Sequence, residues 1–118
     1  LPKRLTVTEF LTLFLGVGKN NKKLKAYMEK YDVPDLKIGK LSKGTLQKVL
    51  IISMLLKKGD LFILDEPIDG LDENSKKLFC LDLADLLKVG TVLISTHNKE
   101  LYTSLSPVLV GFGDFNEK

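Results

Sequence analysis

The pattern of apolar and polar positions changes near Gly59 and divides the sequence into two predicted parts. Before this point, apolar residues recur at intervals of three and four positions, the spacing of a helix with one buried face. After it come short runs of consecutive apolar residues, which are typical of strands in a parallel sheet. We therefore expect a helical part over residues 1–58 and an α/β part over residues 59–118, together forming one domain.

Capping and breaking residues set the limits of the expected elements. Thr6 and Glu9 form a capping box at the start of the first helix, and Lys57 and Gly59 end the third. The expected helices span residues 7–15, 22–31, 42–56 and 73–87, with a loop at 38–40 and a short helix at 98–104. The expected strands span residues 61–64, 91–95 and 107–112, and we expect the first two to be buried on both faces. Strands alternating with helices indicate a parallel sheet with crossover helices.

Composition and charge narrow the class of protein without changing this picture. A chain of 118 residues, 44% hydrophobic and 28% charged, is typical of one soluble globular domain. The net charge is only +3, and the lysines of segment 19–25 belong to a helix with an apolar face. We interpret them as a solvated helix face, nucleic-acid binding being the less favoured alternative. Cys80 is the only cysteine, which excludes an internal disulfide and a CxxC metal site and fits a reducing cytosol.

Residues that can do chemistry follow the first two predicted strands. Asp65 and Glu66 follow the first, and His97 follows the second. Carboxyl ends of parallel strands meet at one edge of a sheet, so we expect these three side chains to lie near each other. There, one carboxylate can hold Mg²⁺, the other can activate a water aimed at a phosphate, and the imidazole can contact a phosphate oxygen. The alternatives are a helix cap or a buried ion pair for the acids, and an ordinary loop role for His97.

The start of the third helix is a second candidate site. Ser42 and Gly44 would offer a hydroxyl and free backbone N–H groups at the positive end of the helix dipole, and Lys43 would add charge. The alternative is an ordinary N-cap by Ser42, which this residue alone favours. Asp72, which follows Glu66 by six residues, is either the N-cap of the next helix or a ligand-site residue, and the sequence leaves both open.

Together these segments resemble a known family, the ATP-binding subunits of ABC transporters. Residues 41–47 resemble the signature motif, residues 61–67 the Walker B motif with its catalytic glutamate, residues 68–72 the D-loop, and residues 95–97 the switch-histidine loop. Four motifs in the family's order and spacing are far more specific than one. The resemblance implies an α/β fold: part of a P-loop NTPase (RecA-like) parallel sheet with crossover helices, preceded by an ABC-type α-helical subdomain.

The resemblance also implies which residues meet ATP and Mg²⁺. Ser42 and Gly44 would contact the γ-phosphate of an ATP molecule bound to the opposing subunit, and Lys43 would belong to the same nucleotide-binding group. Asp65 would support Mg²⁺ in the same kind of site. The partners implied are a second ABC ATPase subunit, in a homodimer or heterodimer, and membrane permease subunits, with no nucleic acid. The subunit would then lie in the cytoplasm, at the inner face of the membrane.

The remaining roles concern hydrolysis. By the same resemblance, Glu66 would be the general base for the attacking water, His97 the γ-phosphate sensor, and Asp72 a residue that couples the two sites across the dimer. The parent subunit would be an enzyme that hydrolyses ATP to drive membrane transport. Two alternatives remain open: a naturally truncated, non-hydrolytic module that completes a partner's nucleotide site, and an ABC ATPase that works outside transport.

The sequence also departs from the family. Lys43 and Thr45 stand where the signature motif usually has glycine and glutamine, which we interpret as variation. No G-x-x-x-x-G-K-[ST] segment (Walker A) occurs in the 118 residues, and the Q-loop glutamine is also absent. A triphosphate needs a cradle of backbone N–H groups and a lysine, so we expect the chain alone to be inactive. We interpret it as a fragment of a longer subunit, or a chain that needs another to complete it.

Overall fold

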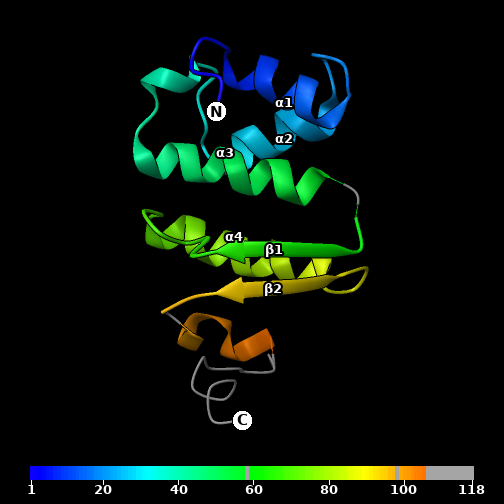
Figure 1. The fold of residues 1–118 in the computed structure, drawn as a ribbon, viewed down its shortest axis with the longest axis vertical. Helices are drawn as coiled ribbons and strands as arrows, with labels where there is room; N and C mark the ends of the chain where they lie inside the picture. Colours follow the sequence, from blue (N-terminus) through cyan, green and yellow to red (C-terminus); the bar gives the residue numbers. More distant parts are fainter. Residues whose placement is uncertain (58, 98, 106–118) are drawn as a thin grey trace, which may run out of the picture.

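The computed structural model describes residues 1–57, 59–97 and 99–105. The first part is helical, with α1 (Val7–Leu15), α2 (Lys22–Lys30), the 3₁₀ helix η1 (Ile38–Lys40) and α3 (Lys43–Leu56). The second part alternates strands and helices, with β1 (Leu61–Asp65), α4 (Glu73–Leu86), β2 (Thr91–Ser95) and the 3₁₀ helix η2 (Lys99–Leu105). In Figure 1, α1 and α2 lie on one side of α3, and β1 lies on the other.

Local caps explain where the first two helices begin and where α1 ends. The Thr6 hydroxyl accepts a hydrogen bond from the Glu9 N–H at 3.1 Å, and the Glu9 carboxylate accepts one from the Thr6 N–H at 2.9 Å. This is the predicted capping box, and these hydrogen bonds lower the pKa of Glu9. Gly16 ends α1 with φ of 68°, in the left-handed region that glycine enters without a steric penalty. Asn21 caps α2 by accepting a hydrogen bond from the Leu24 N–H.

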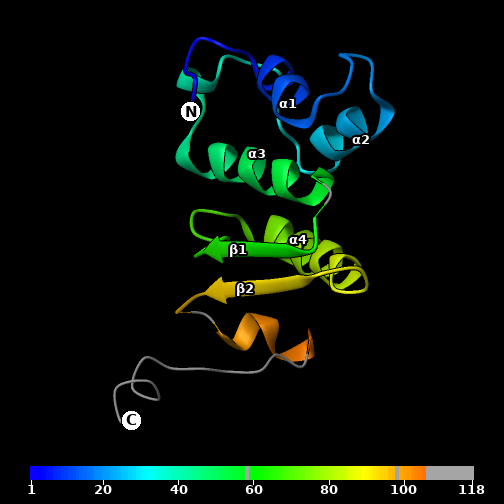
Figure 2. The same cartoon turned by 45° about the vertical axis from the view of Figure 1, so that its right-hand side comes forward.

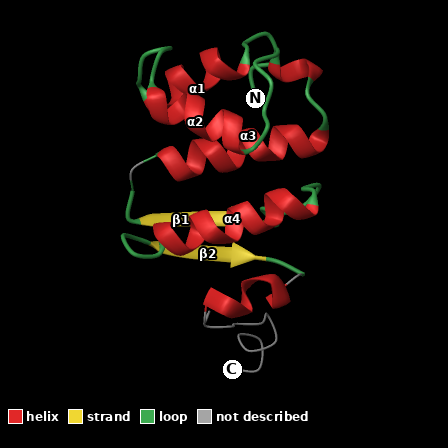
Figure 3. Ribbon diagram, turned by 180° about the vertical axis from the view of Figure 1, so that it is seen from behind, coloured by secondary structure: helices red, strands yellow, loops and turns green. Residues whose placement is uncertain are grey.

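The predicted parallel pairing is confirmed for the two described strands. β1 and β2 form a two-stranded parallel sheet, with Leu61 opposite Thr91 at one end and Asp65 opposite Ser95 at the other. α4 is the crossover helix between them, and Figure 3, seen from behind, shows it lying across one face of the sheet. The ends of both strands therefore arrive at the same edge, which places the segments that follow them side by side.

The expectation that both strands are buried on two faces is wrong for the described residues. On the face toward the core lie Phe62 and, packed against the core cluster, Leu64, Val92 and Ile94. On the opposite face, Leu61, Ile63 and Leu93 are 56%, 73% and 55% exposed. Side chains of a strand alternate between two faces, so one crossover helix covers only every second residue. Within residues 1–57, 59–97 and 99–105, no element covers the second face.

The segment at 38–40 was expected to be a loop, and this is also wrong. It forms η1, because the N–H of the buried Ile38 donates to the Leu5 carbonyl at 2.8 Å and Thr6 pairs with Lys37 in an isolated antiparallel bridge. Pairing between segments distant in sequence thus holds this turn. The short helix expected at 98–104 is the 3₁₀ helix η2, and the strand expected at 107–112 lies outside the described residues.

A buried polar contact joins α2 to α4 within a single hydrophobic core. The core contains residues from both parts, including Leu11 of α1 and Phe79 of α4. The Tyr31 hydroxyl donates to the Asp82 carboxylate at 2.7 Å, and the Lys30 ammonium lies 2.5 Å from the same carboxylate. The pKa of Tyr31 is raised, mainly because its hydroxyl is buried and also because it donates a hydrogen bond to the Asp82 carboxylate. Figure 2 shows α3 between α1 and α2 on one side and the sheet on the other.

None of the helices in the described part of the chain is both long enough and apolar enough to cross a membrane.

Candidate functional site

The edge where both strands end gathers three of the predicted site residues. Asp65 is the last residue of β1, and the Glu66 N–H extends the pairing by donating to the Ser95 carbonyl at 2.8 Å. Glu66 has φ of 43°, in the left-handed region, and there the chain turns away from the sheet. His97 follows β2 at the same edge. The three residues therefore lie at one edge of the sheet, as expected, and the contacts described among them join Glu66 and His97.

The Glu66 carboxylate is held by the segment that follows β2. Its Oε1 accepts a hydrogen bond from the His97 N–H at 2.5 Å, and its Oε2 accepts one from the Thr96 hydroxyl at 3.2 Å. The His97 imidazole is 97% exposed, with Nε2 3.9 Å from Oε1. Sequence analysis predicted the neighbourhood of Glu66 and His97 but not that the main chain of His97 would fix the carboxylate. A carboxylate fixed in this way and still 26% exposed can accept a proton from a water molecule.

Asp65 stands beside Glu66 as an exposed carboxylate. Among the residues that the structure describes, no group of three His, Cys, Asp or Glu side chains could enclose a metal ion. Mg²⁺ usually keeps several waters and takes only one or two carboxylates together with substrate phosphates. The single carboxylate of Asp65 at the end of β1 fits this mode of Mg²⁺ binding. It does not fit a metal ion that must be held by several protein side chains at once.

The start of α3 shows the N-cap arrangement considered for Ser42. The Ser42 hydroxyl accepts a hydrogen bond from the Thr45 N–H at 3.1 Å and donates to the Thr45 hydroxyl at 2.8 Å. Lys43 is exposed and pairs with Asp69 at 3.1 Å. The hydrogen bonds and ion pairs described for Ser42 and Lys43 therefore go to Thr45 and Asp69, and the structure does not bring these two residues into direct contact with Glu66.

Gly44 has a structural reason to be glycine that sequence analysis missed. A Cβ atom added at Gly44 would lie only 2.5 Å from the carbonyl oxygen of Gly70, a separation that real Cβ atoms essentially never have. Gly70 itself has φ of 82°, so glycine suits both positions of this backbone contact. The first turn of α3 thus lies directly on the loop over residues 66–72.

Asp72 caps α4, which is one of the two roles considered for it. Its carboxylate accepts a hydrogen bond from the Ser75 N–H at 2.7 Å, and the Lys48 ammonium lies 3.3 Å from its other oxygen. The pKa of Asp72 is lowered, mainly by the hydrogen bond from the Ser75 N–H and to a smaller extent by Lys48. The ligand-site role remains a prediction, since the cap leaves the side chain 58% exposed.

A second contact between α3 and this loop was also missed. The Gln47 amide donates to the Pro67 carbonyl at 2.8 Å. Only the spacing of Gly44, Gln47 and Lys48, which places them on one side of a helix, could have indicated it. Polar residues at such spacing are also typical of a solvated face, so the spacing alone does not identify a contact.

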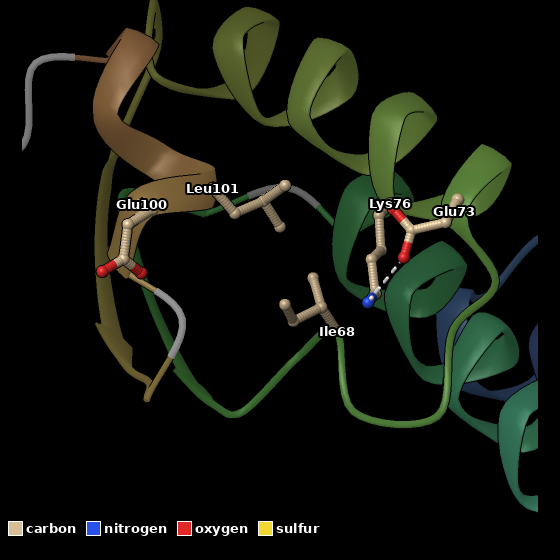
Figure 4. A pocket seen from close by; sticks show the side chains of 5 residues that line it. All are labelled: Ile68, Glu73, Lys76, Glu100 and Leu101. Atoms are coloured by element: carbon tan, nitrogen blue, oxygen red, sulfur yellow. Dashed lines mark hydrogen bonds and ion pairs between the residues drawn. The ribbon is translucent and has the colours of Figure 1, made fainter.

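A pocket of about 320 Å³ lies between the loop, α4 and η2 (Figure 4). It is lined by Ile68, Glu73, Lys76, Glu100 and Leu101. Glu73 and Lys76 form an ion pair at 3.2 Å across its rim. None of the predicted site residues lines this pocket, so the candidate site is the edge at Glu66 and the adjoining start of α3.

Comparison with known proteins gives matches to one family. The family profile described as "ABC transporter" matches residues 1–69. The zinc import ATP-binding protein ZnuC of Rickettsia bellii is 33% identical over 101 residues, which are 84% of this chain and 43% of that protein. The manganese transport system ATP-binding protein MntB of Halalkalibacterium halodurans is 35% identical over 91 residues, covering 72% of this chain and 36% of that protein. The chain thus spans less than half the length of these relatives.

Solved structures give the same result. A putative ABC transporter ATP-binding protein from Pyrococcus furiosus aligns with a TM-score of 0.68 and 29% identity, over 81% of this chain and 51% of that one. An ATP-binding subunit of an ABC transporter aligns with a TM-score of 0.72 and 26% identity, over 85% of this chain and 45% of that one.

Proposed function

The chain belongs to the ABC transporter ATP-binding family, and from this membership we propose that it carries part of the machinery of an ATPase coupled to membrane transport. Its fold is part of a P-loop NTPase (RecA-like) parallel sheet with a crossover helix, preceded by helices. In this proposal, residues 1–58 form the signature-bearing helical subdomain and residues 59–118 belong to the ATPase core. The observation that carries the proposal is the Glu66 carboxylate, fixed by two donors at the end of β1.

Glu66 is the proposed general base. A base must hold a fixed direction toward the proton that it removes, and the His97 N–H and the Thr96 hydroxyl supply that direction. One carboxylate oxygen can take the proton of a water molecule while the other keeps its hydrogen bond. Phosphoryl transfer depends mainly on positioning and electrostatic stabilisation, so a fixed carboxylate suits this reaction.

Asp65 and His97 are the proposed contacts for Mg²⁺ and the γ-phosphate. The Asp65 carboxylate is exposed beside Glu66, and Mg²⁺ held there would neutralise charge on the phosphates. The His97 main chain holds Glu66 while its exposed imidazole is available to a phosphate oxygen. The two functions of His97 use different atoms and so do not compete.

The start of α3 is the proposed contact with a nucleotide on an opposing subunit. Lys43 is exposed, and the helix start offers its unpaired N–H groups and dipole to an anion. Ser42 and Gly44 lie in the same first turn, on the loop that leads to Asp72, which we propose couples the two sites of the dimer. The hydrogen bonds described for Ser42 go to Thr45 and those described for Glu66 go to Thr96 and His97, and in this proposal each group serves a different nucleotide.

Membrane permease subunits and a second ATPase subunit are the proposed partners, with the protein in the cytoplasm at the inner face of the membrane. This rests on the relatives, which are named for zinc import and manganese transport. ATP and Mg²⁺ are the proposed ligands of the assembled site.

The test is Glu66→Gln in the full-length gene product. We expect kcat for ATP hydrolysis to fall roughly 10²-fold or more, the scale of a lost general base. The glutamine side chain has the size of glutamate, but its amide cannot take the proton of the attacking water. The matched control is Glu73→Gln, an 83% exposed glutamate at the start of α4, which should leave kcat unchanged. Near-normal turnover in the Glu66→Gln variant would remove Glu66 from the mechanism, and no turnover in the unaltered protein would favour the non-hydrolytic module.

A further inference from the structure

Gln47 makes a contact that none of the proposed roles accounts for. Its side-chain Nε2 donates to the carbonyl of Pro67 at 2.8 Å, across twenty positions of sequence. Pro67 is buried and follows Glu66 directly in the chain. The amide of Gln47 therefore holds the peptide group between Pro67 and Ile68, one residue beyond the proposed base.

Two further contacts on the same side of α3 reach the later part of the loop. The backbone of Gly44 touches that of Gly70, and the Lys48 ammonium lies 3.3 Å from the Asp72 carboxylate. The ion pair is the weaker attachment, because Asp72 is 58% exposed and water screens such pairs. Of the side-chain contacts between α3 and the loop, the hydrogen bond from Gln47 is thus the one that acts next to Glu66.

The backbone of Glu66 depends on such support. Its φ of 43° lies in a region that residues other than glycine seldom occupy, and such conformations persist when surrounding contacts impose them. On one side, the Glu66 N–H donates to the Ser95 carbonyl at 2.8 Å. On the other side, the Glu66 carbonyl accepts from the Asp69 N–H at 3.1 Å, and Gln47 holds the next carbonyl. The direction of the Cα–Cβ bond of Glu66 is set between these two attachments.

We propose that Gln47 is a positioning residue for ATP hydrolysis, acting through Glu66. Its amide fixes the carbonyl of Pro67, the residue that follows the base, and so helps to direct the Glu66 carboxylate toward the attacking water. The inference rests on the proposed hydrolytic role of Glu66. It assigns Gln47 no contact with the nucleotide, so its loss should affect the chemical step and spare ATP binding.

The experiment compares three substitutions in the full-length gene product. Gln47→Met keeps the length of the side chain and removes the donor, Gln47→Glu replaces the donor with an acceptor, and Gln47→Lys restores a donor of similar reach. We expect kcat to fall about tenfold in the Met variant, the scale of one hydrogen bond, with KM for ATP unchanged within about twofold. The Glu variant should lose more, because its carboxylate faces a carbonyl oxygen, and the Lys variant should regain most of the lost kcat.

Lys88→Met is the control. It removes the donor of an exposed ion pair near the end of α4, at the opposite end of the sheet from Glu66, and should change neither kcat nor KM. If the Gln47→Met variant does not fold, the test rests on the other two variants. We then expect kcat to be higher in Gln47→Lys than in Gln47→Glu. Wild-type kcat in the Met and Glu variants, or a rise in KM that accounts for the loss, would overturn the role of Gln47. Glu66→Gln, measured in parallel, separates this result from failure of the proposed function. If kcat falls in Glu66→Gln but is normal in the Gln47 variants, only the positioning role of Gln47 is refuted.

Discussion

Removal of the Asp82 carboxylate should destabilise the protein through the tyrosine that it leaves behind. Asp82 is 6% exposed and accepts the hydroxyl of Tyr31, which is 1% exposed. Lys30 also contacts this carboxylate, but its side chain is 38% exposed and can turn to water. In Asp82→Ala, the Tyr31 hydroxyl therefore loses its acceptor inside the core, whereas the lysine does not remain buried without a partner.

The cost can be worked from these two groups. A buried hydroxyl without a partner costs about 1–3 kcal/mol, and the half-exposed lysine adds about 0–1 kcal/mol. We expect Asp82→Ala to lower the free energy of unfolding by about 2–3 kcal/mol. Because most of this loss comes from the unpaired hydroxyl, adding Tyr31→Phe should recover about 1 kcal/mol of it. The second substitution thus stabilises the first variant, although each alone destabilises the protein.

Urea denaturation followed by circular dichroism measures these differences. The midpoint for Asp82→Ala should fall by about 1–2 M, and that of the double variant should lie between Asp82→Ala and the unaltered protein. Asp85→Ala is the control on the same helix, since Asp85 is 74% exposed, and it should change the free energy by less than about 0.5 kcal/mol. A small effect of Asp82→Ala, or a double variant less stable than it, would refute the reasoning.

Two further predictions concern the contact at Gly44 and the titration of Tyr31. Gly44→Ala should destabilise the protein by about 1–3 kcal/mol in the same assay, because its methyl group would overlap the Gly70 carbonyl. Gly18→Ala, with no atom within 4 Å of the new methyl, should be neutral or slightly stabilising; equal losses in both would contradict this account. The folded-state pKa of Tyr31 is raised above 10.0, so its contribution to stability is intact below that pH and is lost as pH rises above it. The urea midpoint should therefore drop as the pH rises from about 10 to 11, and less so in Tyr31→Phe; the same drop in both proteins would exclude Tyr31 as the cause.

The elements that sequence analysis predicted best are those whose limits are set locally. The helix at 7–15 is confirmed because Thr6 and Glu9 cap it and Gly16 ends it, and these residues interact within one turn. The gathering of Glu66 and His97 at one edge was also predictable, since parallel pairing brings the ends of two strands together whatever their side chains.

The contacts that escaped prediction join residues far apart in sequence. Gln47 reaches Pro67 and Tyr31 reaches Asp82 only because the helical part of the chain packs against the α/β part, and neither pair has a signature in the sequence itself. The turn at 38–40 likewise depends on residues near the start of the chain. The exposed strand face shows a different limit of sequence analysis. A run of apolar residues indicates that a strand can be buried on both faces, but it does not show whether other elements cover both faces.

That strand face has a thermodynamic consequence. Leu61, Ile63 and Leu93 keep more than half of their surface in water, so most of the transfer free energy of these side chains is unrealised in the described fold. Complete burial of all three would add roughly 3–5 kcal/mol, a large fraction of the roughly 5–15 kcal/mol that typically separates a folded domain from its unfolded state. Any molecule or segment that packs there is linked to folding by mass action, and the melting temperature will rise with its occupancy.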